Sequence, residues 1–144
     1  LYAQGNYKLK SGDDYPLRIY VMFAHDPERM GLLERAKVAA IRALYGREPP
    51  HSSLNYVWAS DPEAPEAFVS PFTDRARIVV LERGTAKVGQ WVEEAVDIGK
   101  DYRKAFGTDP PTTASIAIMN DSDNTGAASV SYVEFLEIGE APAR

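Results

Sequence analysis

Hydrophobic and polar residues alternate in several short stretches of this chain, and a period of two predicts β-strands. Residues 17–24 show the clearest alternation, with an apolar residue at every odd position from Leu17 to Phe23. Residues 115–119 are mostly apolar, which is typical of a strand that is buried on both faces. Further strands are predicted over residues 53–60, 77–83 and 90–98. The last of these also fits a helical stripe, and a strand is the favoured interpretation.

A β-hairpin is predicted from residue 115 to residue 138. A second alternating stretch, residues 129–138, follows the strand at 115–119, and residues 120–126 between them are rich in Asp, Asn and Gly. Such residues form tight turns because their short polar side chains bond the local backbone and because glycine adopts positive φ.

Two helices are predicted. The longer one covers about residues 27–45, because Asp26 is a suitable N-cap, Pro27 fits the first helical position and Gly46 can end the helix. The shorter one covers about residues 100–106 and also ends at a glycine. The longer helix carries one apolar stripe, which predicts that it packs against the core: Met30, Leu33, Ala36, Ala40, Ile41 and Leu44.

These elements predict a mainly β, α+β fold in which an antiparallel sheet packs against a helix, because strands and helices do not alternate as βαβ units. The length suits a single domain over residues 1–144, with residues 139–144 as a flexible tail. The predicted core contains residues from the strongest periodic segments: Phe23, Ile41, Trp58, Val80, Ile118 and Phe135.

Charge and composition exclude several classes of protein. The formal net charge is −5, from 16 basic and 21 acidic residues, and the basic residues are scattered. A nucleic-acid partner is therefore not expected, since phosphate binding requires a basic surface. No apolar stretch has the length of a membrane span. The absence of cysteine excludes disulfides, thiolate metal sites and thiol nucleophiles.

The acidic turn is a candidate calcium site, because hard cations prefer clustered carboxylate and carbonyl oxygens. The candidate ligands are Asp121, Asp123, Asn124 and Thr125. The EF-hand motif is not met, because its twelfth position would be Tyr132 in place of the bidentate Glu. A plain hairpin turn explains the same residues without a metal.

Two sets of residues are candidates for catalysis. His25 beside Asp26 resembles a general-base pair, and His51 is the other histidine, but no nucleophile motif accompanies them. Acidic residues in loops could hydrolyse a glycoside if two carboxyl groups lay about 5–10 Å apart. These acids are Asp13, Asp14, Asp61, Glu63, Glu66 and Asp74. Structural histidines and solvated acids are the alternative interpretation for both sets.

Four aromatic residues are candidates for ligand binding: Tyr20, Tyr56, Trp58 and Trp91. Aromatic faces pack on sugar rings, and Tyr and Trp also carry a polar group that can bond a hydroxyl. Packing in the core is the alternative role for these residues.

An ordered set of motifs over about residues 12–135 resembles a bacterial family known as domain of unknown function 3047. The motifs are GDDYPLRIYVMF, GREPP, SLNYVW, SPFTDRARIVVLERG, GQWVEEAVDIGKDYRKAFGTDPP and IAIMNDSDNTG. The resemblance implies a secreted or periplasmic bacterial protein with a jelly-roll-like β-sandwich, akin to carbohydrate-binding modules. It implies no catalytic residues. Members of the family usually have further strands before the first of these motifs, and we expect this chain to lack them.

The combined expectation is a non-catalytic extracytoplasmic binding or structural module, with a glycan as the expected ligand. A polysaccharide hydrolase that uses loop carboxylates is one alternative, and a subunit of a larger assembly is another. If strands are missing, a second polypeptide or a second copy of the chain would complete the sheet, because open sheet edges invite aggregation.

Overall fold

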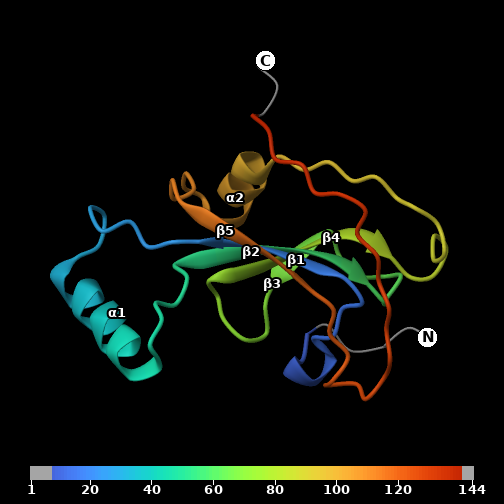
Figure 1. The fold of residues 1–144 in the computed structure, drawn as a ribbon, viewed down its shortest axis with the longest axis horizontal. Helices are drawn as coiled ribbons and strands as arrows, with labels where there is room; N and C mark the ends of the chain where they lie inside the picture. The colour runs from blue at the N-terminus through green and yellow to red at the C-terminus, as the bar shows by residue number, and fades with distance from the viewer. Residues whose placement is uncertain (1–7, 141–144) are drawn as a thin grey trace.

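The computed structural model of the chain describes residues 8–140, which form one five-stranded sheet, two α-helices and a short 3-10 helix (Figure 1). The elements are η1 (Lys10–Gly12), β1 (Arg18–Phe23), α1 (Leu32–Tyr45), β2 (Ser52–Ala59), β3 (Ala67–Val69), β4 (Ala76–Arg83), α2 (Ile98–Phe106) and β5 (Ala114–Met119). The predicted strands at 17–24, 53–60, 77–83 and 115–119 are therefore confirmed to within one or two residues.

The strand order in the sheet is β3-β4-β2-β1-β5. Strands β2 and β4 are parallel, while the other three neighbouring pairs are antiparallel. The parallel pair arises because the chain leaves β2, forms β3 at the outer edge and returns through β4 between them. The α+β class is confirmed, but the prediction of a purely antiparallel sheet is wrong. The described residues form one open sheet, so the jelly-roll-like sandwich is not confirmed.

Each face of the sheet carries part of the core. Helix α2 covers one face (Figure 1), where Tyr102 packs on Phe23 with ring centroids 4.5 Å apart and Leu54 is fully buried. The other face is covered by loops that contribute Tyr15 and Ala64. Ile78 of β4 is fully buried on this second face.

Phe23 and Val80 are buried as predicted, whereas three other predicted core residues are exposed. Ile118 is 52% exposed because β5 is an edge strand, and Ile41 is 38% exposed on α1. Phe135 is 64% exposed. Trp58 is half-buried.

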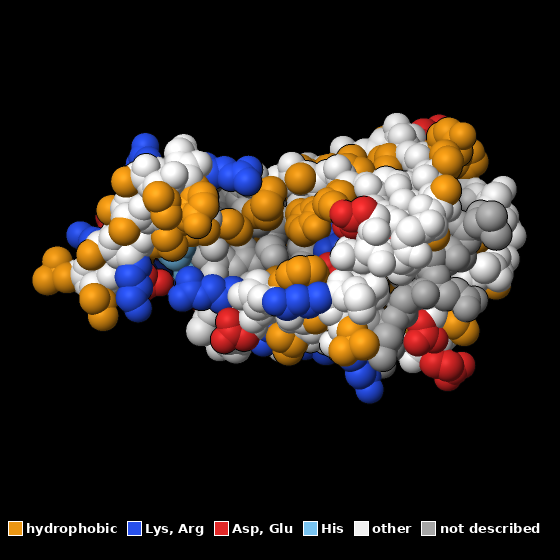
Figure 2. Space-filling view, turned by 90° about the horizontal axis from the view of Figure 1, so that it is seen from below, with side chains coloured by type: hydrophobic (Ala, Val, Ile, Leu, Met, Phe, Trp, Pro, Cys, Tyr) orange, Lys and Arg blue, Asp and Glu red, His pale blue; other side chains and the backbone are white. Residues whose placement is uncertain are grey.

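Helix α1 begins later than predicted and does not cover the core. The side chain of Asp26 accepts a hydrogen bond from the backbone N–H of Glu28, which makes a local turn, and Gly31 is the residue before the helix. Of the helix, only Val38 is buried. Figure 2 shows hydrophobic side chains spread over this end of the molecule, and the exposed ones on α1 are Leu32, Leu33, Ile41, Leu44 and Tyr45.

Helix α2 begins at Ile98, two residues before the predicted start, because Asp97 caps it by accepting a hydrogen bond from the Lys100 backbone N–H at 2.9 Å. The strand predicted over residues 90–98 is wrong, since neither residues 91–96 nor the cap Asp97 form a strand. A short strand, β3, lies within residues 61–74. No apolar alternation in this proline-containing stretch distinguishes the strand from a loop.

The predicted hairpin is half right. β5 is its first strand, but residues 127–140 form no strand. The turn between them is bonded to the loop before β1 instead, as described below. Most of the predicted flexible tail, and all of the N-terminal stretch before Lys8, lies outside the described residues.

No helix within residues 8–140 has the length and apolar character that crossing a membrane requires. This finding agrees with the expectation from the sequence.

Candidate functional site

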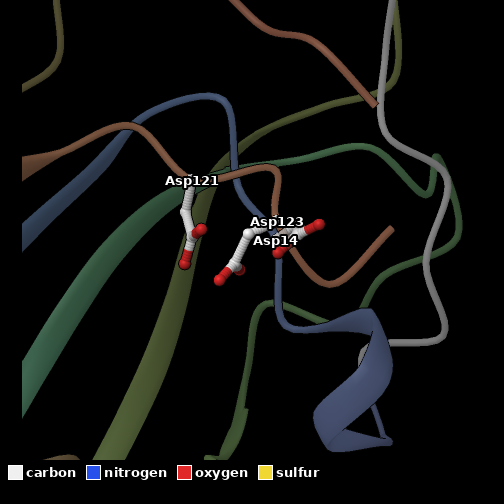
Figure 3. A group of neighbouring side chains, drawn as sticks. All are labelled: Asp14, Asp121 and Asp123. Atoms are coloured by element: carbon white, nitrogen blue, oxygen red, sulfur yellow. The ribbon is translucent and has the colours of Figure 1, made fainter. Parts of the chain in front are cut away.

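An acidic cluster of Asp14, Asp121 and Asp123 lies where the loop before β1 meets the loop after β5 (Figure 3). The antiparallel register pairs Arg18 with Met119, so the start of β1 and the end of β5 lie at the same end of the sheet. The Asp121 backbone N–H donates to the Tyr15 carbonyl at 3.1 Å, which holds the two loops together.

Asp14 is the buried anchor of this junction. Its carboxylate accepts four hydrogen bonds, from the backbone N–H and the side chain of both Asn124 and Thr125, over 2.6–3.2 Å. Burial would raise the pKa of Asp14, but the bonds from Thr125 and Asn124 outweigh it and hold the pKa below its usual range. The ionised Asp14 carboxylate therefore stabilises the folded protein at pH values above its unfolded-state pKa. This stabilisation is lost as the pH falls through the folded-state pKa of Asp14.

The acidic cluster has the composition of a site for a hard cation. One carboxylate oxygen from each residue lies within 4.8 Å of the others. Burial raises the pKa of Asp121, and the carboxylates of Asp123 and Asp14 raise it further. A cation would relieve this repulsion, and Ca²⁺ prefers such oxygen ligands.

The cluster differs from the predicted ligand set. Asp121 and Asp123 are brought together as predicted, but the side chains of Asn124 and Thr125 act as donors to Asp14. The third carboxylate, Asp14, was not among the predicted ligands. The sequence around the turn could not identify Asp14, because only the pairing of β1 with β5 brings this residue to the turn.

Calcium binding by the acidic cluster stays a prediction with a direct test. If Ca²⁺ binds with the affinity typical of extracellular modules, about 10 mM CaCl2 should raise the melting temperature by roughly 3–10 °C, since a ligand of the folded state stabilises it. A chelator should reverse the gain. The double variant Asp121→Asn/Asp123→Asn should show no gain, and an equal gain in that variant would place any calcium elsewhere.

A buried ion pair supports the same junction. Two nitrogens of Arg18 lie 3.0 Å from Oδ2 of Asp13, and one of them also donates to the Asp13 carbonyl at 2.7 Å. The guanidinium lies 4.5 Å from the centre of the Tyr15 ring. Burial raises the pKa of Asp13, although the charge and the hydrogen bond of Arg18 oppose this rise. Asp13 and Asp14 are thus bonded within the fold.

The four predicted ligand-binding aromatics do not share one surface. Tyr56 is buried under α2 and donates to Asp101 at 2.9 Å. Tyr20 lies on the opposite face, since its neighbour Ile19 is the residue paired with Tyr56. The Trp58 indole donates to the Gly84 carbonyl at 2.9 Å, and Trp91 is 69% exposed.

The two histidines lie together, whereas the candidate His25–Asp26 pair is not among the contacts of the described residues, since the Asp26 carboxylate pairs with Arg29 at 3.2 Å. Their rings are 5.3 Å apart, and Nδ1 of the buried His25 lies 3.9 Å from Glu34. His51 shares a hydrogen bond with Ser52 at 3.0 Å, and Ser52 shares another with Tyr102 at 2.8 Å. A cavity of about 230 Å³ borders His51 and Tyr102. Burial lowers the pKa of His51, and the charge of His25 lowers it further.

A larger cavity of about 690 Å³ lies between strands β3–β4 and helix α2. Val79 and Leu81 of β4 and Ala105 of α2 give it apolar walls. We name it the cationic groove, because four basic side chains line it: Arg77, Arg83, Lys100 and Lys104.

Three acids also line the cationic groove, and they do not neutralise all of the positive charge of its four basic side chains. Asp97 caps α2, Asp101 accepts from Tyr56, and Glu66 lies 3.8 Å from Lys104. Arg77 donates to the Asp74 carbonyl and Arg83 to the Ala64 carbonyl, and neither bond neutralises their charge. The groove can therefore bind an anionic group beside an apolar one.

Comparison with known proteins identifies a family but no function. No curated protein and no solved structure matches the chain. Residues 1–137 match the family described as "Protein of unknown function (DUF3047)". The match covers nearly the whole sequence, and the chain belongs to this family.

Proposed function

We propose that the protein is a non-catalytic binding module that holds an acidic oligosaccharide in the cationic groove. One observation carries the proposal: a protein with a net charge of −5 gathers four basic side chains around a single groove. Charged and polar groups set in an apolar cavity fix the orientation of a ligand. The carboxylates of an acidic sugar suit Arg and Lys, and its C–H faces suit Val79 and Leu81.

Isothermal titration calorimetry with trigalacturonic acid tests this proposal. The acidic trimer should bind, and a neutral galactose trimer should bind at least about tenfold more weakly, because a charged hydrogen bond contributes about 1.5–3 kcal/mol. Lys100→Glu should weaken binding of the acidic trimer by about tenfold or more, since Lys100 is exposed in the groove.

Lys37→Glu is the matched control, because Lys37 is an exposed lysine on α1 and does not line the groove. It makes the same change in net charge and should leave the affinity unchanged. Equal losses of affinity in the two variants would show that only the net charge of the protein matters, and they would contradict the proposed site.

A polysaccharide hydrolase remains the second candidate, and one observation favours it. Glu66 precedes β3 on one side of the groove, while Asp97 and Asp101 lie at α2 on the other side. Mass spectrometry of the trimer after incubation separates the two functions. Intact trimer supports the binding module, and products of water addition across a glycosidic bond support the hydrolase.

The remaining expectations concern the setting of the module. We propose an extracytoplasmic location, which the family resemblance and an acidic glycan ligand both favour. A jelly-roll-like sandwich stays a proposal as well, in which the sheet would form one layer of a larger assembly. The exposed apolar side chains of α1 support packing of this helix against a further part of such an assembly.

A further inference from the structure

Residues 132–138, here called the C-terminal segment, have the composition of a strand but belong to none. The segment, YVEFLEI, is rich in aromatic and β-branched residues, which favour strands. Tyr132 is 76% exposed and Ile138 is 69% exposed. Within the described part of the chain, residues 132–140 make no hydrogen bond. Among the described residues, the backbone groups of the segment are thus unpaired, and its apolar side chains are exposed.

The turn explains why this segment does not return along β5. Asp14 holds Asn124 and Thr125, Ser129 donates to the Asn120 side chain at 2.8 Å, and Ser131 donates to the Pro16 carbonyl. These bonds attach the chain before residue 132 to the loop that precedes β1. Figure 1 accordingly shows the red segment crossing the end of the sheet instead of running beside β5.

The sheet offers one edge that suits such a segment. Its edge strands are β3, with three residues, and β5, with six. β5 contains no charged residue and no proline, which are the usual protection of an edge strand. Ile118 and Met119 on β5 are exposed. An uncharged edge can also pair beside Glu134 and Glu137 without repulsion between like charges.

We propose that the C-terminal segment of one copy pairs with the β5 edge of a second copy, whose own segment pairs in return. Seven extended residues span about 23 Å, enough to pair along a strand of six. The exchange is reciprocal, so it closes as a two-fold dimer and exposes no further edge. Aromatic side chains bury about 150–250 Å² each, so Tyr132 and Phe135 of both copies supply much of the roughly 1,000 Å² that a specific interface requires.

The dimer is independent of the proposed function, because the cationic groove lies at the β3–β4 edge and the exchange occurs at the opposite edge. Light scattering on the purified chain tests it first. The mass should be about twice 15.9 kDa. Tyr132→Asp/Phe135→Asp should give monomers with unchanged far-ultraviolet circular dichroism, and Leu32→Asp, at an exposed site on α1, should remain dimeric. A monomeric wild type at about 100 μM would overturn the proposal.

Cross-linking tests which surfaces meet. The chain has no cysteine, so single-cysteine variants give covalent species only between copies. A mixture of Ser115→Cys and Glu134→Cys, both exposed positions, should form cross-linked dimers with a short bismaleimide. A mixture of Lys37→Cys and Glu134→Cys should form several-fold fewer. Equal yields in the two mixtures would contradict exchange at β5, even if the protein is dimeric.

Discussion

Substitution of Arg18 by glutamine should lower the free energy of unfolding by about 3–5 kcal/mol at pH 7, because it leaves the buried Asp13 carboxylate without its cationic partner. Arg18 and Asp13 are both 4% exposed, so water cannot replace the lost bonds. Urea denaturation of the variant and the wild type measures the difference. The double variant Asp13→Asn/Arg18→Gln removes the charge as well and should recover part of the loss.

The loss should depend on pH in a direction that identifies its cause. Burial raises the folded-state pKa of Asp13 even with Arg18 present, and removal of Arg18 takes away an interaction that lowers it. The folded variant therefore binds a proton more readily than the unfolded chain, and its stability rises as the pH falls toward the unfolded-state pKa. The deficit relative to wild type should shrink between pH 7 and about pH 4. A deficit that is constant over this range would show that the loss comes from packing alone.

Substitution of Leu54 by alanine should cost about 2–5 kcal/mol, because this β2 side chain is fully buried on the sheet face that α2 covers and its removal leaves a cavity. Leu44→Ala is the matched control. Leu44 is 75% exposed on α1, so the same change should alter the stability by no more than about 0.5 kcal/mol. Thermal or urea denaturation compares the two variants. A comparable loss at Leu44 would mean that α1 packs against the protein in solution.

The strands of the sheet centre could be predicted from the sequence because burial on one or both faces requires closely spaced apolar residues in them. β1, β2 and β4 carry the apolar positions that become Phe23, Leu54 and Ile78 of the core. The parallel pairing of β2 and β4 could not be predicted, since β3 has only three residues in a stretch with several prolines. Prediction of the strand order therefore required β3, an element too short to show a pattern of apolar and polar residues in the sequence.

The periodic pattern misled wherever an apolar face has no partner within the described chain. The helical stripe of α1 and the alternating residues around Phe135 resemble faces that pack in a core, yet they are exposed. A pattern reports that a face is suited to burial, but it does not identify what buries it. The proposed exchange at β5 provides such a partner for the C-terminal segment.

The candidate sites were only partly predictable for a related reason. The acids of the turn, Asp121 and Asp123, are two positions apart in the sequence, and the pattern identified them. Asp14 joins them only through the pairing of β1 with β5, and the cationic groove combines residues from β4 and α2. Sites that depend on strand order cannot be predicted before the strand order is known.

Binding in the cationic groove is tested most directly by nuclear magnetic resonance of the ¹⁵N-labelled protein during titration with trigalacturonic acid. The largest changes in amide chemical shift should occur at residues that line the groove, among them Val79, Leu81 and Lys100. The changes should saturate with the affinity measured by calorimetry. Shifts confined to the turn 121–126, or no saturable shifts at all, would contradict the proposed site.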